Sequence, residues 1–159
     1  MRLALYQPDI PQNTGTILRL AACLEVPVDI IGPAGFDMTD RSLRRAGLDY
    51  LDHVKMIRYE SFATYLASRG LKPGRLILLS SHADVAHTGF TFAADDTLLL
   101  GRESAGVPAE VHARADARIR IPIQAPLRSL NIAVAAAIVL GEALRQTGGF
   151  PAGGPYKPG

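Results

Sequence analysis

Two aliphatic runs constrain the fold more than any other feature of this sequence. Residues 76–79 read Leu-Ile-Leu-Leu and residues 98–100 read Leu-Leu-Leu, with no polar residue at alternate positions. A strand with one face in water alternates apolar and polar residues, whereas a strand that is covered on both faces does not. We therefore expect both runs to be strands of a parallel sheet that is covered on both faces.

The rest of the chain alternates between strand-like and helix-like segments. The patterns predict further strands over residues 3–6, 26–31, 54–59 and 119–123, and helices from Asn13 onward and over residues 39–46, 61–68 and 129–146. Asn13 and Ser129 are the expected N-caps of the first and last helices. This alternation predicts a single-domain parallel-sheet α/β fold over residues 1–146, and the Gly/Pro-rich residues 147–159 are expected to form a flexible tail.

Composition excludes several classes of protein. The 159 residues, 48% hydrophobic and 20% charged, suit one globular domain. Cys23 is the only cysteine and the four histidines lack metal-ligand spacing, so we expect neither disulfides nor a metal. No apolar run approaches the roughly 18 residues of a membrane helix and no signal-peptide core is present, which favours a cytoplasmic protein without membrane contact.

Arginine outnumbers lysine by 14 to 3, within a net charge of only +2. The planar guanidinium suits phosphate contacts, although codon bias explains the same excess. Arg41, Arg44 and Arg45 form a basic cluster that reads either as a phosphate-contacting surface or as an ordinary solvated helix face.

Three loops hold the candidate functional residues, because ligands in such sheets bind outside the carboxyl ends of the strands. The first loop spans residues 7–15 and leads to Arg19. A helix that starts at Asn13 would offer free N–H groups to a phosphate. A capped helix with a solvated Arg19 explains the same residues without any ligand.

The second loop, over residues 101–108, has two glycines that let a ligand approach the backbone, Gly101 and Gly106. Its Glu103 is either a hydrogen-bonding group for a ligand or an exposed surface carboxylate. The spacing matches neither a P-loop nor a nucleophile elbow. In the third loop, Ser129 is explained by helix capping alone, but Arg128 next to Asn131 is not.

Together the three loops resemble the SPOUT superfamily of RNA methyltransferases, in its SpoU/TrmH branch. The motifs occur in the order that this branch shows: Asn13-Thr14-Gly15 followed by Arg19, then Gly101-Arg102-Glu103-Ser104-Ala105-Gly106-Val107-Pro108, then Ile121-Pro122-Ile123 followed by Arg128-Ser129-Leu130-Asn131-Ile132. Residues 5–15 and 43–50 are similar to the single-domain group of the branch that modifies the tRNA wobble nucleotide. The resemblance covers residues 3–146, while Arg102 and Gly141 replace a Pro and a Tyr that are frequent in relatives.

The resemblance implies a C-terminal trefoil knot, a homodimer, and 2′-O-methylation with S-adenosylmethionine (SAM), which leaves S-adenosylhomocysteine. The implied substrate is the ribose of the wobble nucleotide, cytidine or a modified uridine at position 34 of leucine tRNAs, with the anticodon arm held on the dimer surface. The implied catalytic residues are Arg19, acting from the partner subunit, with Asn13, Glu103 and Asn131. The implied cofactor-binding residues are Leu79, Ser80, Gly101, Glu103, Gly106, Ile121, Ser129 and Leu130. The RNA-binding candidates are Arg41, Arg44, Arg45, Arg102 and Arg128.

Other functions remain open on the sequence. The chain suits a 2′-O-methyltransferase acting at another tRNA or rRNA site, or a non-catalytic RNA- or nucleotide-binding module. A flavodoxin-like binder fits less well, because Pro8 and Pro11 occupy the loop that would hold its phosphate. Calorimetric titration with SAM separates these classes.

Overall fold

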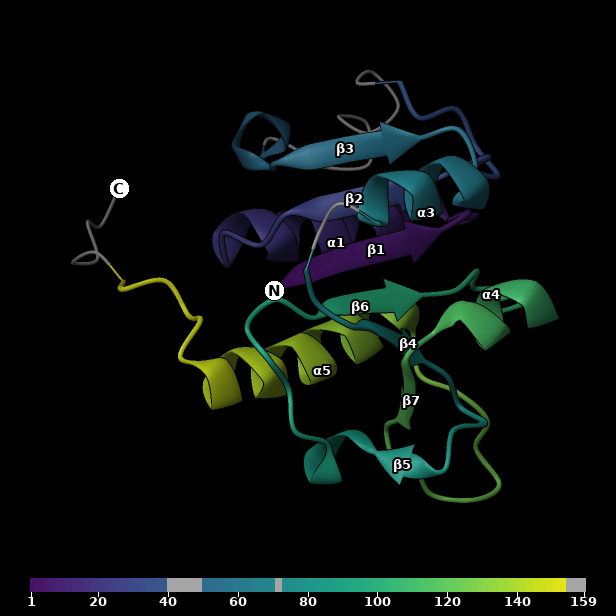
Figure 1. Ribbon diagram of the computed structural model, residues 1–159, viewed down its shortest axis with the longest axis vertical. Helices are drawn as coiled ribbons and strands as arrows, with labels where there is room; N and C mark the ends of the chain where they lie inside the picture. Colours follow the sequence, from purple (N-terminus) through teal and green to yellow (C-terminus); the bar gives the residue numbers. More distant parts are fainter. Residues whose placement is uncertain (40–49, 71–72, 154–159) are drawn as a thin grey trace.

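The computed structural model describes residues 1–39, 50–70 and 73–153, and its strands form one parallel sheet (Figure 1). The sheet has seven strands in the order β3-β2-β1-β6-β4-β7-β5. The strands are β1 (Arg2–Tyr6), β2 (Val28–Ile31), β3 (Met56–Tyr59), β4 (Leu76–Leu79), β5 (Val85–Ala86), β6 (Thr97–Leu100) and β7 (Ala117–Arg120). The expected α/β class and parallel sheet are confirmed. The helix expected over residues 39–46 falls, apart from Thr39, outside the described residues.

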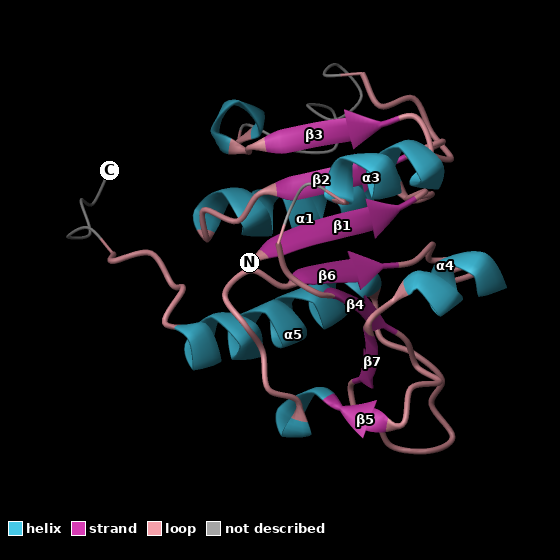
Figure 2. Ribbon diagram, viewed as in Figure 1, coloured by secondary structure: helices cyan, strands magenta, loops and turns pink. Residues whose placement is uncertain are grey.

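Helices cover both faces of this sheet (Figure 2). One face packs against α1 (Pro11–Cys23) and α5 (Ile132–Thr147), and the other against α3 (Phe62–Arg69) and α4 (Ala109–Arg114). Short 3-10 turns, η1 (Leu51–His53) and η2 (His87–Gly89), join the elements. Leu98 and Leu100 belong to the core below α1 and α5, whereas Leu99 belongs to the opposite core. The unbroken aliphatic run is thus buried on both sides, as its pattern predicts.

Leu99→Ala is expected to lower the free energy of unfolding by about 3 kcal/mol, because it opens a cavity in a fully buried layer. Leu99 is 0% exposed, while Ile57 on the edge strand β3 is 45% exposed and provides a matched control. Ile57→Ala is expected to cost less than about 1 kcal/mol. Urea denaturation of both variants checks this, and equal shifts of the two midpoints would contradict the assignment of Leu99 to a central strand.

Three element boundaries differ from the sequence-based expectation. The N-cap of α5 is Asn131 rather than Ser129, and its Oδ1 accepts hydrogen bonds from the Ala133 and Val134 N–H groups at 2.9 and 3.3 Å. Helix α1 starts at Pro11, so Asn13 lies in its first turn and not at the cap. Proline is favoured at that first position because it has no N–H to leave unpaired. The last strand ends at Arg120, which leaves Ile121 in the loop that follows.

The strand register aligns the carboxyl ends of the central strands. Leu100 at the end of β6 pairs with both Leu5 of β1 and Leu79 of β4, and Leu79 pairs in turn with Ile119 of β7. The loops after these four strands therefore leave the sheet at one edge, which is where parallel sheets bind ligands. The trefoil knot and the domain boundary at residue 146 stay predictions. None of the described helices is long and apolar enough to cross a membrane.

Candidate functional site

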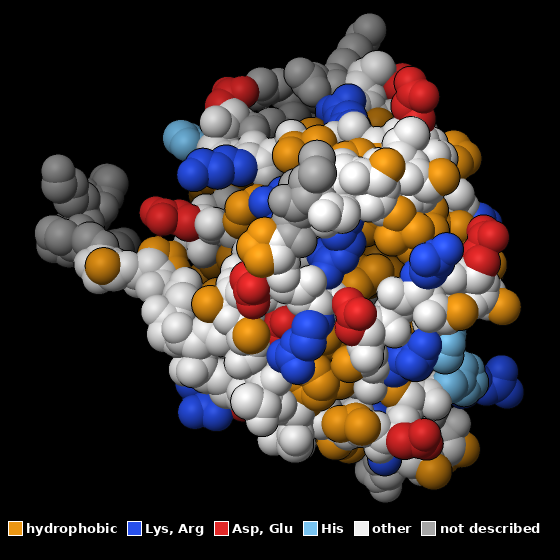
Figure 3. All heavy atoms as spheres, in the orientation of Figure 1, with side chains coloured by type: hydrophobic (Ala, Val, Ile, Leu, Met, Phe, Trp, Pro, Cys, Tyr) orange, Lys and Arg blue, Asp and Glu red, His pale blue; other side chains and the backbone are white. Residues whose placement is uncertain are grey.

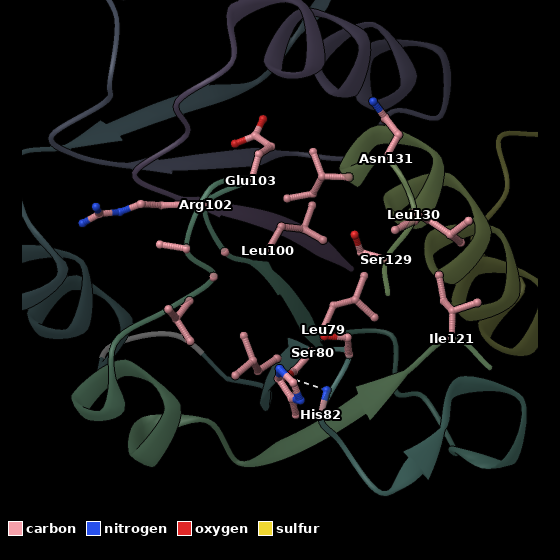
Figure 4. Close-up of a pocket in the computed structure, with 18 of the residues that line it drawn as sticks. Leu79, Ser80, His82, Leu100, Arg102, Glu103, Ile121, Ser129, Leu130 and Asn131 are labelled. Atoms are coloured by element: carbon pink, nitrogen blue, oxygen red, sulfur yellow. Dashed lines mark hydrogen bonds between the residues drawn. The ribbon is translucent and has the colours of Figure 1, made fainter. Parts of the chain in front are cut away.

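A cavity of about 650 Å³ opens at the carboxyl edge of the sheet, among the loops that follow β4, β6 and β7. Figure 4 shows Leu79, Leu100, Ile121 and Leu130 around its interior, with Glu103 and Asn131 together at one end. This size and this mixture of aliphatic and polar side chains suit a small-molecule site. All eight residues predicted to bind a cofactor line the cavity: Leu79, Ser80, Gly101, Glu103, Gly106, Ile121, Ser129 and Leu130.

The loop over residues 101–106, below called the 101–106 loop, is closed on itself at its base. The backbones of Arg102 and Gly106 exchange two N–H···O hydrogen bonds, each 2.9 Å long. Gly106 adopts a φ of 63°, which favours glycine. A Cβ on Gly101 would lie 2.7 Å from the carbonyl carbon of Gly106, so the close approach of the two strands of the loop requires glycine there.

Asp9, in the loop after β1, ties the 101–106 loop to the first strand. Its carboxylate accepts hydrogen bonds from the Glu103 N–H at 3.1 Å, from the Ser104 N–H at 3.3 Å and from the Ser104 hydroxyl. In return the Asp9 N–H donates to Glu103 Oε2 at 3.3 Å. The first two candidate loops, over residues 7–15 and 101–108, are therefore joined by hydrogen bonds.

The Asp9 and Glu103 carboxyl groups affect each other's ionisation, and their pKa values shift in opposite directions. The bond with Glu103, aided by the bonds from Ser104 and the loop N–H groups, lowers the pKa of Asp9 to about 2. Burial, followed by the bond with Asp9, raises the pKa of Glu103, while backbone N–H groups and Asn13 oppose that rise. The pair thus favours an ionised Asp9 beside a protonated Glu103.

The third loop joins the same site through the Asn131 side chain. Its Oδ1 caps α5, which leaves its Nδ2 free to donate to Asn13 Oδ1 at 2.9 Å. Asn13 and Asn131 line the cavity. Figure 4 shows Asn131 on the side of Glu103, and Asn13 is a hydrogen-bond partner of Glu103. A line of polar side chains from three separate segments, Asn131, Asn13 and Glu103, therefore stands at one end of the cavity.

Arg19 lies apart from this line. Its guanidinium stacks on the Tyr50 ring, 4.8 Å from the ring centroid, and it is exposed and absent from the cavity lining. Six residues turn a helix by about 240°, so Arg19 projects from a different side of α1 than Asn13. Three of the four predicted catalytic residues meet at the cavity, and Arg19 does not reach the cavity of its own chain.

The predicted RNA-binding arginines differ in their surroundings. Arg102 Nη2 donates to Gln7 Oε1, its guanidinium lies 5.8 Å from the Tyr6 ring centroid, and Figure 4 shows it pointing away from the other cavity side chains. Arg128 is exposed in the third loop. Arg41, Arg44 and Arg45 fall outside the described residues. On the face in Figure 3, basic side chains are interspersed with acidic ones.

Several residues of the site were not singled out from the sequence. No sequence motif pointed to Asp9 or Gln7, because their hydrogen-bond partners, Glu103 and Arg102, are 94 and 95 positions away along the chain. His112 lines the cavity as well, and so does His82, for which the sequence favoured an ordinary surface position over a pocket. The backbone N–H of His82 donates to Ser80 Oγ at 3.3 Å. Within the described ranges, no group of acidic, histidine or cysteine side chains is arranged to hold a metal ion.

Comparisons with known proteins agree on one family. The model of the "SpoU rRNA Methylase family" matches residues 1–141. The chain is 62% identical over 146 residues to the tRNA (cytidine(34)-2′-O)-methyltransferase of Beijerinckia indica, covering 92% of this chain and 91% of that protein.

Solved structures give the same result. One described as "Structural insights into the 2-OH methylation of C/U34 on tRNA" superposes with a TM-score of 0.83 at 43% identity, covering 91% of this chain and 94% of that one. The SpoU methyltransferase AviRb of Streptomyces viridochromogenes, in complex with the cofactor AdoMet, superposes with a TM-score of 0.82 at 29% identity, covering 92% of this chain and 57% of that one.

Proposed function

The chain belongs to the SpoU rRNA methylase family, and on that premise we propose that it methylates the ribose 2′-oxygen of the wobble nucleotide, position 34, of tRNA. The proposed substrates are leucine tRNAs with cytidine or a modified uridine at that position, and the proposed compartment is the cytoplasm. The relatives named for methylation at cytidine 34 and C/U34 support the position. The observation that carries the proposal is the line of Asn131, Asn13 and Glu103 at one end of the cavity.

The residues of the cavity fit SAM. The AviRb complex supports this assignment, and aliphatic walls beside the backbone of the 101–106 loop suit an adenosine group. SAM supplies an electrophilic methyl group and leaves as S-adenosylhomocysteine. The walls would be Leu79, Ile121 and Leu130, with polar contacts from Ser80, Ser129 and the 101–106 loop. No metal takes part in the proposed reaction.

The protein chiefly has to align the ribose hydroxyl with the methyl group. An arginine side chain stays protonated, so Arg19 serves here as a phosphate clamp that polarises the 2′-hydroxyl, whose proton leaves to phosphate or water. Asn13 orients Arg19 or the ribose, and Glu103 and Asn131 support the same end of the cavity.

A homodimer accounts for the distance between Arg19 and the cavity of its own chain, because a second copy can supply the arginine. The outer face of α5 supports this, since Val134 and Ile138 are 49% and 39% exposed. The side of α5 that carries Ala136, Val139, Leu140 and Ala143 is buried in the core of the chain itself. The proposed interface is the opposite stripe of the same helix.

Binding of the anticodon arm is expected to weaken steeply with salt, since arginine–phosphate contacts release counterions. Arg128→Ala is expected to weaken tRNA binding and to reduce the slope of log affinity against log salt by about one. Filter binding at several salt concentrations measures both quantities. An unchanged slope would remove Arg128 from the RNA-binding surface.

Two measurements test the proposed function. Calorimetry with SAM is expected to show binding to the purified protein, and mapping of 2′-O-methylation in total tRNA is expected to show position 34 unmodified in a deletion strain and restored on complementation. Absence of SAM binding would favour the non-catalytic RNA-binding module. Loss of a methyl group at another tRNA or rRNA position would keep the reaction and change the substrate.

A further inference from the structure

We propose that Asp9 is a positioning residue of the methyl-transfer site, which holds the 101–106 loop and Glu103 in place through the hydrogen bonds between Asp9 and that loop. The proposal rests on the proposed function, because the loop that Asp9 holds lines the proposed SAM cavity. Asp9 does not line that cavity itself, whereas Glu103, Gly101 and Gly106 do. Its effect on the reaction must therefore pass through the loop.

The geometry makes Asp9 the junction of two loops. Three donors of the 101–106 loop converge on its carboxylate: the N–H groups of Glu103 and Ser104, and the Ser104 hydroxyl. Ionised acceptors form the stronger hydrogen bonds, so a charged Asp9 suits this position. Asp9 is also a donor to the loop, since its backbone N–H donates a hydrogen bond to Glu103 Oε2.

The backbone of Asp9 is held from its other side as well. A Cβ on Gly35 would lie 2.9 Å from Asp9 Cβ and 3.0 Å from Asp9 Cα, so Gly35 and Asp9 pack against each other without spare room. The Gly35 N–H donates to the carbonyl of the preceding residue, Pro8, at 2.9 Å. Asp9 therefore acts as a fixed point, and the 101–106 loop is placed relative to it.

The proton on Glu103 makes the contact between Asp9 and the 101–106 loop depend on pH, and the direction of this dependence can be predicted. Burial and the bond with Asp9 raise the pKa of Glu103, so Glu103 stays protonated beside the ionised Asp9 above the usual pH range of a carboxyl group. When the pH rises through the raised pKa, two carboxylates face each other and repel. The loop is then held less firmly, and SAM binding is expected to weaken.

Other groups at the cavity also titrate or carry charge, and the test has to separate them. Around the pair, Asn13 from α1 contacts Glu103, and Arg102 from the same loop donates to Gln7. His82 and His112 face the cavity from the loop after β4 and from α4. Glu103→Gln removes the ionisable group of Glu103 and leaves His82 and His112 in place, so it isolates the contribution of the carboxyl pair.

The test measures the KM for SAM and kcat across pH for four proteins: the wild type, Asp9→Asn, Glu103→Gln and the control Asp95→Asn. Asp95 is exposed next to the start of β6, at the opposite edge of the sheet. Asp9→Asn is expected to raise the KM for SAM by about tenfold, because a charge-assisted hydrogen bond to the loop is lost. The change in kcat is expected to be smaller. KM of the wild type is expected to rise with pH, this rise is expected to be absent in Glu103→Gln, and Asp95→Asn is expected to match the wild type.

The outcomes distinguish this proposal from the function on which it rests. A wild-type protein that neither binds SAM nor transfers methyl groups would overturn the proposed function. An active wild type whose KM stays unchanged in Asp9→Asn, or whose pH profile persists in Glu103→Gln, would overturn the assignment of Asp9 alone. Circular dichroism and thermal unfolding of Asp9→Asn show whether the variant is folded. If it is not, the comparison of Glu103→Gln with the wild type still decides the question through the pH profile.

Discussion

Arg19→Ala is expected to reduce methyl transfer by about 10²–10³-fold while SAM binding stays at the wild-type level. The loss follows from the proposed role of the guanidinium, which clamps the phosphate next to the attacking ribose and polarises its hydroxyl. Binding is spared because Arg19 stacks on Tyr50 outside the cavity. Single-turnover methylation assays and calorimetry measure the two quantities, and Arg114→Ala, an exposed arginine in the last turn of α4, is the control.

Unchanged methyl transfer in Arg19→Ala would show that Arg19 is not a catalytic residue. If methyl transfer is lost, complementation decides whether Arg19 acts at the cavity of its own chain or of the other chain. When Arg19→Ala and Gly101→Ala chains are co-expressed with different tags, mixed dimers are expected to regain about half of the activity, because one of their two sites combines an intact cavity with an intact Arg19 from the other chain. Inactive mixed dimers would mean that Arg19 acts on its own cavity or that the chains do not share sites.

Gly101→Ala is expected to weaken SAM binding by about 10²-fold, because the base of the 101–106 loop has no room for a Cβ. The added atom would meet the carbonyl carbon, Cα and oxygen of Gly106 at 2.7, 2.9 and 2.9 Å. These are backbone atoms, which cannot rotate away as the end of a flexible side chain can. The hydrogen-bonded backbones of Arg102 and Gly106 must therefore move apart. Calorimetric titration with SAM measures the effect.

Gly89→Ala is the matched control for this variant. A Cβ at Gly89 would meet nothing within 4 Å, so the same chemical change is expected to leave SAM binding unchanged. Wild-type affinity in Gly101→Ala would contradict the placement of the loop base at the cofactor cavity.

The fold was predictable where local pattern decides it. The unbroken run that contains Leu98 and Leu99 identifies a strand buried on both faces. The helix expected over residues 61–68 is found as α3, which Ser61 caps and Gly70 ends. Elements too short to show a period, such as α4 and β5, were missed. Their positions depend on packing in the complete sheet.

The site was predictable as a set of loops and not as a set of contacts. Glycine spacing around Glu103 indicated a ligand loop, but no pattern in one sequence links that residue to Asp9. Ser129 and Asn131 are both good caps; the structure uses Asn131, whose side chain also donates to Asn13, a contact between distant segments that the sequence does not show. Arg19 was expected to act from a second chain on resemblance alone, and its stacking on Tyr50 is a tertiary contact that periodicity does not predict.

The most direct test of the central claim uses two synthetic anticodon stem-loops that differ by one atom. One has a ribose at position 34, and the other has a 2′-deoxyribose there; both are incubated with the purified protein and SAM labelled in its methyl group. We predict one label per molecule of the ribose substrate, released with nucleotide 34 on digestion, and none in the deoxy substrate. Label in the deoxy substrate, or at any other nucleotide, would contradict the proposed 2′-O-methylation of the wobble position.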